Sequence, residues 1–196
     1  ARRPWSMPSL YIMTFGAFSG LAATFPLLIK QIYGGFEGAP DPLAWAFYGP
    51  LVGSAARVVA GPLSDKLGGA RVTHWAGLGM LASTVWVTTL TSPTGLDSFP
   101  MFVAGMLTMF FFAGVGNAST FKQMPMLFEP RQAGGVIGFT AAIAAYGPFL
   151  FGMLFAASFG AFKSATPVLY GLAAFFASNV VLNWWMYARR GAANPC

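Results

Sequence analysis

Charged residues are scarce in this sequence of 196 residues, where Asp, Glu, Lys and Arg together make up only 8%. Soluble domains carry about a quarter charged residues, so this chain lacks the side chains that would cover a surface in water. Hydrophobic residues make up 56% of the chain, which excludes a disordered protein. The 24 glycines and 20 phenylalanines instead fit a polytopic membrane protein, because glycine is common in membrane helices.

Side chains that bind metals or catalyse reactions are also few. The single cysteine, Cys196, excludes an intrachain disulfide and a cysteine metal cluster, and the single histidine, His74, has no clustered ligand beside it. All five acidic residues lie in joints or at helix ends, which leaves general acid–base catalysis without a carboxylate pair. The 11 basic residues form no stripe that would bind nucleic acid. We therefore expect no enzyme activity, metal, cofactor or nucleic-acid partner.

Six long apolar segments follow one another along the chain. A bilayer core about 30 Å thick needs about 20 apolar residues of helix. The runs are unbroken, whereas the strands of a membrane barrel would alternate between apolar and polar residues. The first run is too long for a signal peptide and ends in no cleavage pattern. We predict six transmembrane helices, at residues 9–33, 43–63, 72–90, 99–121, 134–158 and 165–187.

The basic residues are distributed unevenly between the two sides that six spans would define. One side carries eight of them, namely Arg2, Arg3, Lys66, Arg71, Lys122, Arg131, Arg189 and Arg190. The other side carries only Lys30 and Lys163, next to the acidic Glu37, Asp41 and Asp97. Positively charged loops remain in the cytoplasm, so this distribution predicts that both termini are cytoplasmic.

Arg57 is the one basic residue that belongs to neither side. It lies inside the predicted span 43–63, about 10 Å from its cytoplasmic end. An arginine at the centre of a membrane helix costs about 2.5–3.5 kcal/mol, so it should face a cavity or a partner. It could extend to the interface or pair with a carboxylate at a helix end. We favour an anion site, because no span contains a neutralising carboxylate and the planar guanidinium matches a planar oxyanion with two parallel N–H groups.

Three further groups of residues allow a structural and a functional interpretation. Tyr11 and Phe15 share a helix face, as a packing pair or as part of a binding site. Asn117 lies among small and hydroxyl residues, which suits either close helix packing or a polar patch on a substrate path. Gly138, four residues after Gly134, makes one helix face thin enough for a neighbouring backbone to approach, and the same spacing recurs at Gly16 and Gly20 and at Gly49 and Gly53. The following Gly147-Pro148 should loosen or kink that helix.

The joint after the second span resembles a known signature. The segment Gly61-Pro-Leu-Ser-Asp65-Lys66-Leu-Gly68-Gly69-Ala-Arg71 is similar to the loop G-x-x-x-D-[RK]-x-G of the major facilitator superfamily. That loop follows the second helix of each six-helix half and locks neighbouring helices at the cytoplasmic face. The resemblance implies an all-α membrane protein in which residues 1–196 form one six-helix half of a 12-helix fold. Within the loop, Asp65 can cap a helix or pair with a cation, and the glycines allow a tight turn.

Further segments resemble the NarK-type nitrate/nitrite porters of this superfamily, specifically helices seven to twelve. They are Tyr11-Ile-Met-Thr-Phe15-Gly-Ala-Phe, the Arg57 span, Gly114-Val-Gly-Asn-Ala-Ser-Thr-Phe and Gly138-Phe-Thr-Ala-Ala-Ile-Ala-Ala-Tyr-Gly147. The resemblance implies that Arg57 binds nitrate, with a hydroxyl contact from Tyr11 and an aromatic wall from Phe15. Candidate substrate contacts also include Gly138, Thr140 and Asn117. A serine is usual where Ala141 stands here, and Thr140 is the adjacent hydroxyl.

The interpretation that unites these observations is the C-terminal half of a nitrate/nitrite transporter in a bacterial cytoplasmic (inner) membrane. Its expected partners are nitrate, nitrite, the lipid bilayer and a missing N-terminal half that supplies a second arginine. Rocking of the two halves would give alternating access to a site near the midplane. The lack of a mid-membrane carboxylate favours exchange over proton-coupled uptake. The alternatives are a porter for another small anion, such as a carboxylate or phosphate, and a scaffold subunit that transports nothing.

Overall fold

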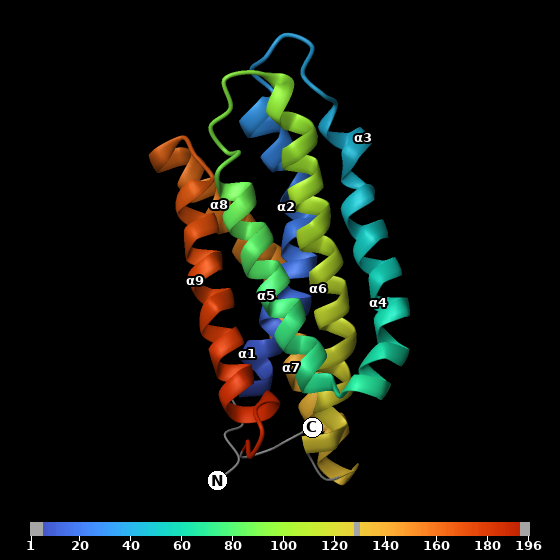
Figure 1. Ribbon diagram of the computed structural model, residues 1–196. Helices are drawn as coiled ribbons and strands as arrows, with labels where there is room; N and C mark the ends of the chain where they lie inside the picture. The colour runs from blue at the N-terminus through green and yellow to red at the C-terminus, as the bar shows by residue number, and fades with distance from the viewer. Residues whose placement is uncertain (1–5, 128–129, 193–196) are drawn as a thin grey trace.

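The computed structural model describes residues 6–127 and 130–192, and every regular element within them is a helix (Figure 1). Arg2 and Arg3, which we predicted to lie on the cytoplasmic side, and Cys196 lie outside the described residues. In chain order the helices are α1 (Ser6–Tyr11), the π-helical turn η1 (Ile12–Gly16), α2 (Ala17–Tyr33), α3 (Pro42–Ala46), α4 (Tyr48–Leu67), α5 (Gly69–Thr88), the 3₁₀ turn η2 (Leu96–Ser98), α6 (Phe99–Leu127), α7 (Pro130–Ala144), α8 (Gly147–Phe162), α9 (Thr166–Asn183) and the π-helical turn η3 (Trp184–Ala188).

Successive helices combine into long rods that run side by side (Figure 1). Five rods are long and apolar enough to cross a membrane: Ser6–Tyr33, Pro42–Leu67, Leu96–Met126, Gly134–Phe162 and Thr166–Ala188. The helix α5 occupies the predicted span 72–90 and is long enough, but it is less apolar than the others. It packs against both α6 and α9, and polar side chains such as Thr73 and Thr84 are buried in it. A helix that neighbouring helices cover can carry more polar residues than one that faces lipid.

Two of the predicted joints are mostly helical. We expected a joint at 64–71, but α4 continues to Leu67 and α5 begins at Gly69. We also expected a joint at 122–133, where α6 continues to Leu127 and α7 begins at Pro130. Polar residues do not end a helix that has left the hydrocarbon core, because its backbone hydrogen bonds remain satisfied there. As a result, Arg57 lies about 15 Å from the end of α4 rather than about 10 Å.

The predicted weakness at Gly147-Pro148 is confirmed as a break between α7 and α8, the two helices of the rod Gly134–Phe162. The helix α7 ends at Ala144, and α8 begins at Gly147 with proline in its first turn. This break places the backbone of α8 directly on the first rod. A Cβ atom on Gly147 would lie only 2.2 Å from the carbonyl oxygen of Gly16, so only glycine permits this approach.

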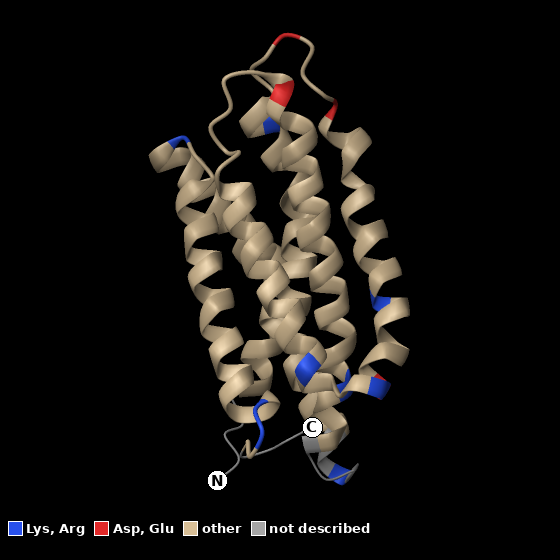
Figure 2. Ribbon diagram, viewed as in Figure 1, with Lys and Arg blue, Asp and Glu red and all other residues tan. Residues whose placement is uncertain are grey.

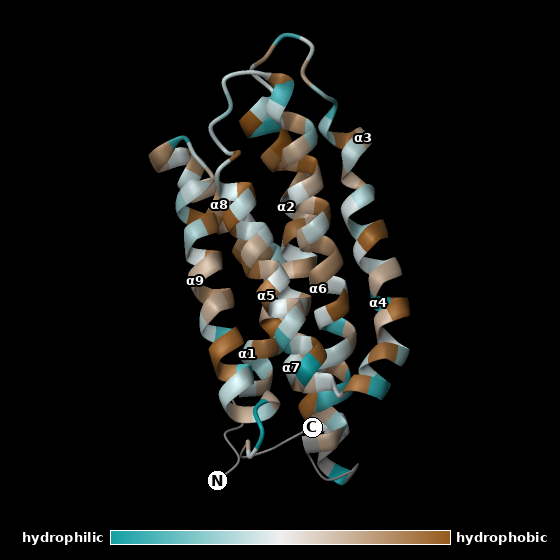
Figure 3. Cartoon of the chain, in the orientation of Figure 1, coloured by the Kyte–Doolittle hydropathy of each residue, from teal (hydrophilic) through white to brown (hydrophobic). Residues whose placement is uncertain are grey.

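Apolar and charged residues are separated along the bundle. The sides of the rods are largely hydrophobic (Figure 3), with large exposed side chains such as Val58, Val59 and Tyr170. Acidic residues gather at the end formed by the α2–α3 and α5–α6 connections, and basic residues predominate at the opposite end (Figure 2). An apolar belt between two charged ends is the surface that a lipid bilayer stabilises.

Candidate anion site

A π-helical turn in the first rod positions the two aromatic candidates. Tyr11 immediately precedes the turn Ile12–Gly16, and Phe15 lies within it. The two rings stack with their centroids 5.3 Å apart and an angle of 16° between their planes. Tyr11 is 4% exposed, and Phe15 is partly buried. Such turns in otherwise α-helical segments frequently occur at functional sites. The sequence pattern did not predict this one.

Arg57 is the tenth residue of α4 and is exposed on the surface of the chain. Among the described residues, Asp65 and Lys122 form the one ion pair, so no carboxylate neutralises Arg57. The first rod touches α4 one helical turn before Arg57, where a Cβ atom on Gly53 would collide with the ring of Phe18. The structure therefore brings Arg57 and the stacked Tyr11–Phe15 pair into one region, although they come from different rods.

A close crossing of α4 and α6 fixes the position of Arg57. A Cβ atom on Gly114 would lie 2.1 Å from the carbonyl oxygen of Gly53, one helical turn before Arg57. A Cβ atom on Gly49 would collide with the ring of Phe110. The prediction that glycines four residues apart mark a helix contact is thus confirmed for Gly49 and Gly53. Backbones that touch directly leave α4 little freedom to move against α6.

The polar residues at the end of α6 divide into two groups. Ser119 hydrogen-bonds to Thr73 of α5 at 2.7 Å, and Thr120 hydrogen-bonds to Thr14 of the π turn at 3.0 Å. These two residues therefore fit the packing interpretation. Asn117 differs from them, because it is buried and its Oδ1 has no hydrogen-bond partner. An unpaired buried acceptor destabilises a protein unless another group satisfies it.

The candidates on α7 also differ from each other. Thr140 is buried, and its hydroxyl has no hydrogen-bond partner. The helix that carries it packs against α1, the π turn and α6. Gly138 is exposed, and nothing lies within 4 Å of a Cβ atom placed there; the same holds for Gly134. The close approach of a neighbouring backbone that we expected at these glycines is therefore not made within this chain.

The signature loop forms the predicted tight turn. Gly68, alone between α4 and α5, has φ = 89°, a left-handed conformation that favours glycine. Asp65 pairs with the Lys122 side chain and so joins the ends of α4 and α6. Gly69 lies against α6, because a Cβ atom there would be 3.0 Å from the carbonyl oxygen of Ser119. The loop thus connects three rods at the end where basic residues predominate.

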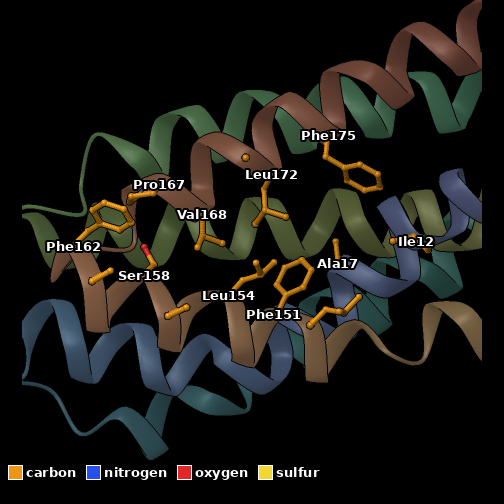
Figure 4. A pocket seen from close by; sticks show the side chains of 14 residues that line it. Ile12, Ala17, Phe151, Leu154, Ser158, Phe162, Pro167, Val168, Leu172 and Phe175 are labelled. Atoms are coloured by element: carbon orange, nitrogen blue, oxygen red, sulfur yellow. The ribbon is translucent and has the colours of Figure 1, made fainter.

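A pocket at the other side of the first rod has a lining that does not suit an anion. This pocket, with a volume of about 640 Å³, lies between α8, α9 and the first rod (Figure 4). Its lining is apolar apart from Ser158, whose hydroxyl donates to the carbonyl oxygen of Ser164 at 2.6 Å. The residues that the structure describes contain no group of three His, Cys, Asp or Glu side chains that could hold a metal ion.

Sequence reasoning missed several residues that position the site. The π turn and the partners Thr14, Thr73 and Gln123 were not singled out. The signal that could have found them is polarity inside an apolar span, since a buried hydroxyl or amide needs a partner on another helix. Together the rods and the unpaired arginine define a class: a polytopic all-α membrane protein with a candidate anion site on an exposed face.

Comparisons with known proteins identify the family within this class. No family model matches the chain. The "Probable nitrate/nitrite antiporter NarK2" of Thermus thermophilus is 64% identical over 195 residues, which is 100% of this chain and 44% of that protein. The "Nitrate/nitrite transporter NarU" of Escherichia coli is 32% identical over 212 residues, or 95% of this chain and 44% of that protein. The "Nitrite extrusion protein" of Bacillus subtilis is 29% identical over 184 residues, or 93% and 44%.

The chain therefore belongs to the NarK-type nitrate/nitrite transporter family of the major facilitator superfamily. It spans less than half the length of the relatives that it matches. The predicted resemblance is thereby confirmed. The prediction that the chain is not an enzyme is confirmed as well, because these relatives are named as transporters or an extrusion protein.

Proposed function

We propose that this chain is the C-terminal six-helix half of a transporter that exchanges nitrate and nitrite by alternating access. The observation that carries the proposal is Arg57, an arginine inside a membrane rod with no carboxylate partner among the described residues. An arginine in that position needs compensation, and an oxyanion supplies it with a negative charge and acceptors for two parallel N–H groups. The names of the relatives support nitrate and nitrite as that anion.

The surroundings of Arg57 suit a small planar anion. The Tyr11 hydroxyl adds a further donor, and the face of Phe15, which stacks on the Tyr11 ring, adds an aromatic wall. Asn117 and Thr140 have buried polar atoms without partners, which makes them candidates for additional contacts. Gly138 leaves open space on the outer face of α7. In this proposal, Arg57 supplies most of the binding energy and the other residues position the anion.

The missing half would cover the apolar surface that surrounds Arg57. Val58 and Val59 directly follow Arg57 and are exposed, as are Phe139 on α7 and Phe149 on α8. A partner of six further helices agrees with the 44% of the relatives' length that the chain spans. The anion would then bind between the halves near the midplane, and the second half would contribute another arginine.

Counterflow measurements test this function. The complete transporter is reconstituted in vesicles loaded with nitrite, and the uptake of labelled nitrate is followed for the wild type and Arg57→Ala. We expect saturable exchange in the wild type and none in the variant, with equal amounts of folded protein. Exchange by folded Arg57→Ala at the wild-type rate would contradict the proposal. A porter for carboxylate or phosphate would instead show exchange with those anions, and a scaffold would show none.

Exchange is proposed over proton-coupled uptake for two reasons. No carboxylate of the described residues pairs with Arg57, and one relative is named an antiporter. Nitrate uptake should therefore depend on nitrite inside the vesicles and persist when a protonophore removes the pH gradient. Uptake that stops with the protonophore and needs no internal nitrite would indicate proton coupling.

We further propose that the protein lies in the bacterial cytoplasmic membrane with both ends of this chain in the cytoplasm. Most basic residues of the described chain lie at the end that includes Gly68, and the opposite end includes residues 34–42 (Figure 2). With Cys196 replaced, a cysteine at Lys66 should resist an impermeant thiol reagent added outside the cell, whereas one at Glu37 should react. The reverse labelling pattern would invert this topology.

A further inference from the structure

Four basic residues surround a second pocket, at the end of the bundle where basic residues predominate. Lys66 and Arg71 approach it from the α4–α5 turn, and Arg189 and Arg190 approach it from the end of the last rod. The pocket has a volume of about 450 Å³, and no carboxylate lines it. We call it the basic pocket. Four like charges in one small volume repel one another unless an anion lies among them.

Two tight turns build the basic pocket. Gly68 and Gly191 both line it and both have positive φ angles, 89° and 73°. The turn at Gly191 is closed by a hydrogen bond from the Ala192 N–H to the carbonyl oxygen of Arg189 at 3.1 Å. The Asn183 side chain donates to the carbonyl oxygen of Ala70 at 2.8 Å and so ties the last rod to the start of α5. The cations are thus held by fixed backbone, not by a loose tail.

The charges of the basic pocket have no neutralising partner in the described chain. Asp65, the acidic residue next to Lys66, pairs with Lys122 outside the pocket. Arg189 donates from Nε to the carbonyl oxygen of Trp185 at 3.1 Å, and its guanidinium lies 4.2 Å from the Trp185 ring centroid. These contacts orient Arg189 but leave its terminal N–H groups to other acceptors.

Exposed tryptophans place the basic pocket at the level of lipid headgroups. Trp75, one turn after Arg71 on α5, is 69% exposed, and Trp184 and Trp185 are 45% and 56% exposed. Tryptophan is enriched at the membrane–water interface, where its ring lies among the headgroups. A cationic pocket beside exposed tryptophans at the end of two membrane rods is therefore next to lipid phosphates, and basic pockets between membrane helices bind anionic headgroups.

We propose that the basic pocket binds the phosphate-bearing headgroup of an anionic phospholipid. The phosphodiester would accept hydrogen bonds from Arg190 and Arg71, and Lys66 and Arg189 would add charge at the rim. The bound lipid would join the α4–α5 turn to the last rod and relieve the repulsion among the four cations. This role is independent of nitrate, because Arg57 does not line the basic pocket.

Lipid-specific fluorescence quenching tests the proposal on the complete transporter in detergent micelles. Brominated phosphatidylglycerol quenches tryptophans beside which it binds, and brominated phosphatidylcholine is the neutral comparison. We expect quenching at lower concentrations of phosphatidylglycerol than of phosphatidylcholine. Each Lys or Arg near a membrane surface contributes enough for about a fivefold change in affinity, so Arg190→Gln should weaken phosphatidylglycerol binding about fivefold and Arg189→Gln with Arg190→Gln roughly thirtyfold.

Arg131→Gln is the matched control, because Arg131 is an exposed arginine at the start of α7 and does not line the basic pocket. It should leave phosphatidylglycerol binding unchanged. If the double variant fails to fold, Arg190→Gln and Lys66→Gln are compared with this control singly. Equal binding of both lipids, or equal loss in Arg131→Gln and Arg190→Gln, would overturn the proposal. Displacement of the lipid by a similar concentration of glycerol 3-phosphate would identify a soluble phosphate as the ligand and overturn the lipid site.

Discussion

The surface around Arg57 and the polar seam between three rods satisfy their polar groups in opposite ways. The polar seam consists of Thr14, Thr73, Ser119, Thr120 and Gln123. Within it, the Gln123 amide donates to the Thr73 hydroxyl at 2.6 Å, Thr73 bonds to Ser119, and Ser119 donates to the carbonyl oxygen of Gly116 at 3.0 Å. Arg57 carries a full charge, and no carboxylate of the described chain pairs with it.

This difference distinguishes polar residues that hold the helices together from a charged residue that is available to a ligand. The seam's hydroxyls have partners on neighbouring helices, so they hold the π turn, α5 and α6 together. A charge costs more than a hydroxyl in a membrane, yet no carboxylate of the described chain pairs with Arg57. We infer that the chain keeps Arg57 for a ligand and the seam for its own packing. Each of the following predictions tests one part of this contrast.

The largest effect is expected at the crossing that both regions depend on. Gly114→Ala places a Cβ atom 2.1 Å from the Gly53 carbonyl oxygen and must push α4 away from α6. Such overpacking costs about 1–3 kcal/mol, and here the upper end or more, because the obstacle is backbone. We expect a lower midpoint of thermal unfolding and loss of exchange. Gly171→Ala is the control, since nothing lies within 4 Å of its Cβ position, and equal midpoints for the two variants would contradict the crossing.

The second prediction compares a substitution in the polar seam with a substitution of Arg57. Thr73→Val leaves Ser119 and Gln123 without a shared partner and should cost about 1–3 kcal/mol of stability, with little change in the KM for nitrate. Arg57→Gln should leave the unfolding midpoint unchanged or higher and abolish exchange. Unfolding curves measure the stability of both variants, and transport assays measure their exchange of nitrate and nitrite. A larger loss of stability from Arg57→Gln than from Thr73→Val would make the arginine structural.

A smaller effect is expected from the pair that connects the π turn to α6. Thr14 and Thr120 hydrogen-bond at 3.0 Å, and the hydroxyl that accepts in this pair can donate its own proton to a backbone carbonyl of its helix. A double-mutant cycle with Thr14→Val and Thr120→Val should give a coupling of about 0.6 kcal/mol, the average for such bonds between membrane helices. Denaturation of the four proteins measures it. Coupling of zero would show that the seam does not hold the π turn in place.

The smallest effect is expected at the ion pair of the signature loop. Asp65 and Lys122 are both about half exposed, so water and salt screen their attraction. Asp65→Asn should cost about 0.5 kcal/mol or less, and the difference should vanish at high salt. Measuring the unfolding midpoint at low and high ionic strength checks this. A cost of several kcal/mol that persists in salt would mean that the pair is a major lock.

The sequence predicted the positions of the rods well because apolar length is a local property. It misplaced helix ends at Leu67 and Leu127, since polarity marks where a helix leaves the hydrocarbon and not where it stops. Glycine spacing identified the contact of Gly53, because close backbone approach has a sequence requirement. The partners of Ser119 and Thr120, however, depend on how whole helices are rotated against one another, and no local pattern encodes that rotation.

The candidate site was predictable to a similar extent. Arg57 stands out by charge alone, and the Tyr11–Phe15 stack follows from their spacing. The π turn that orients this stack and the open space at Gly138 do not follow from it. The π turn depends on competing backbone hydrogen bonds. The open space at Gly138 depends on which neighbouring helices the face of α7 meets.

Nitrate binding by Arg57 variants of the complete transporter tests the central claim most directly. Calorimetric titration with nitrate compares the wild type, Arg57→Lys and Arg57→Gln after each is shown to be folded. Lysine keeps the charge but lacks the planar pair of N–H groups. We predict tenfold to hundredfold weaker binding for Arg57→Lys, corresponding to the loss of one charge-assisted hydrogen bond of about 1.5–3 kcal/mol, and no measurable binding for Arg57→Gln. Wild-type affinity in folded Arg57→Gln would contradict the account.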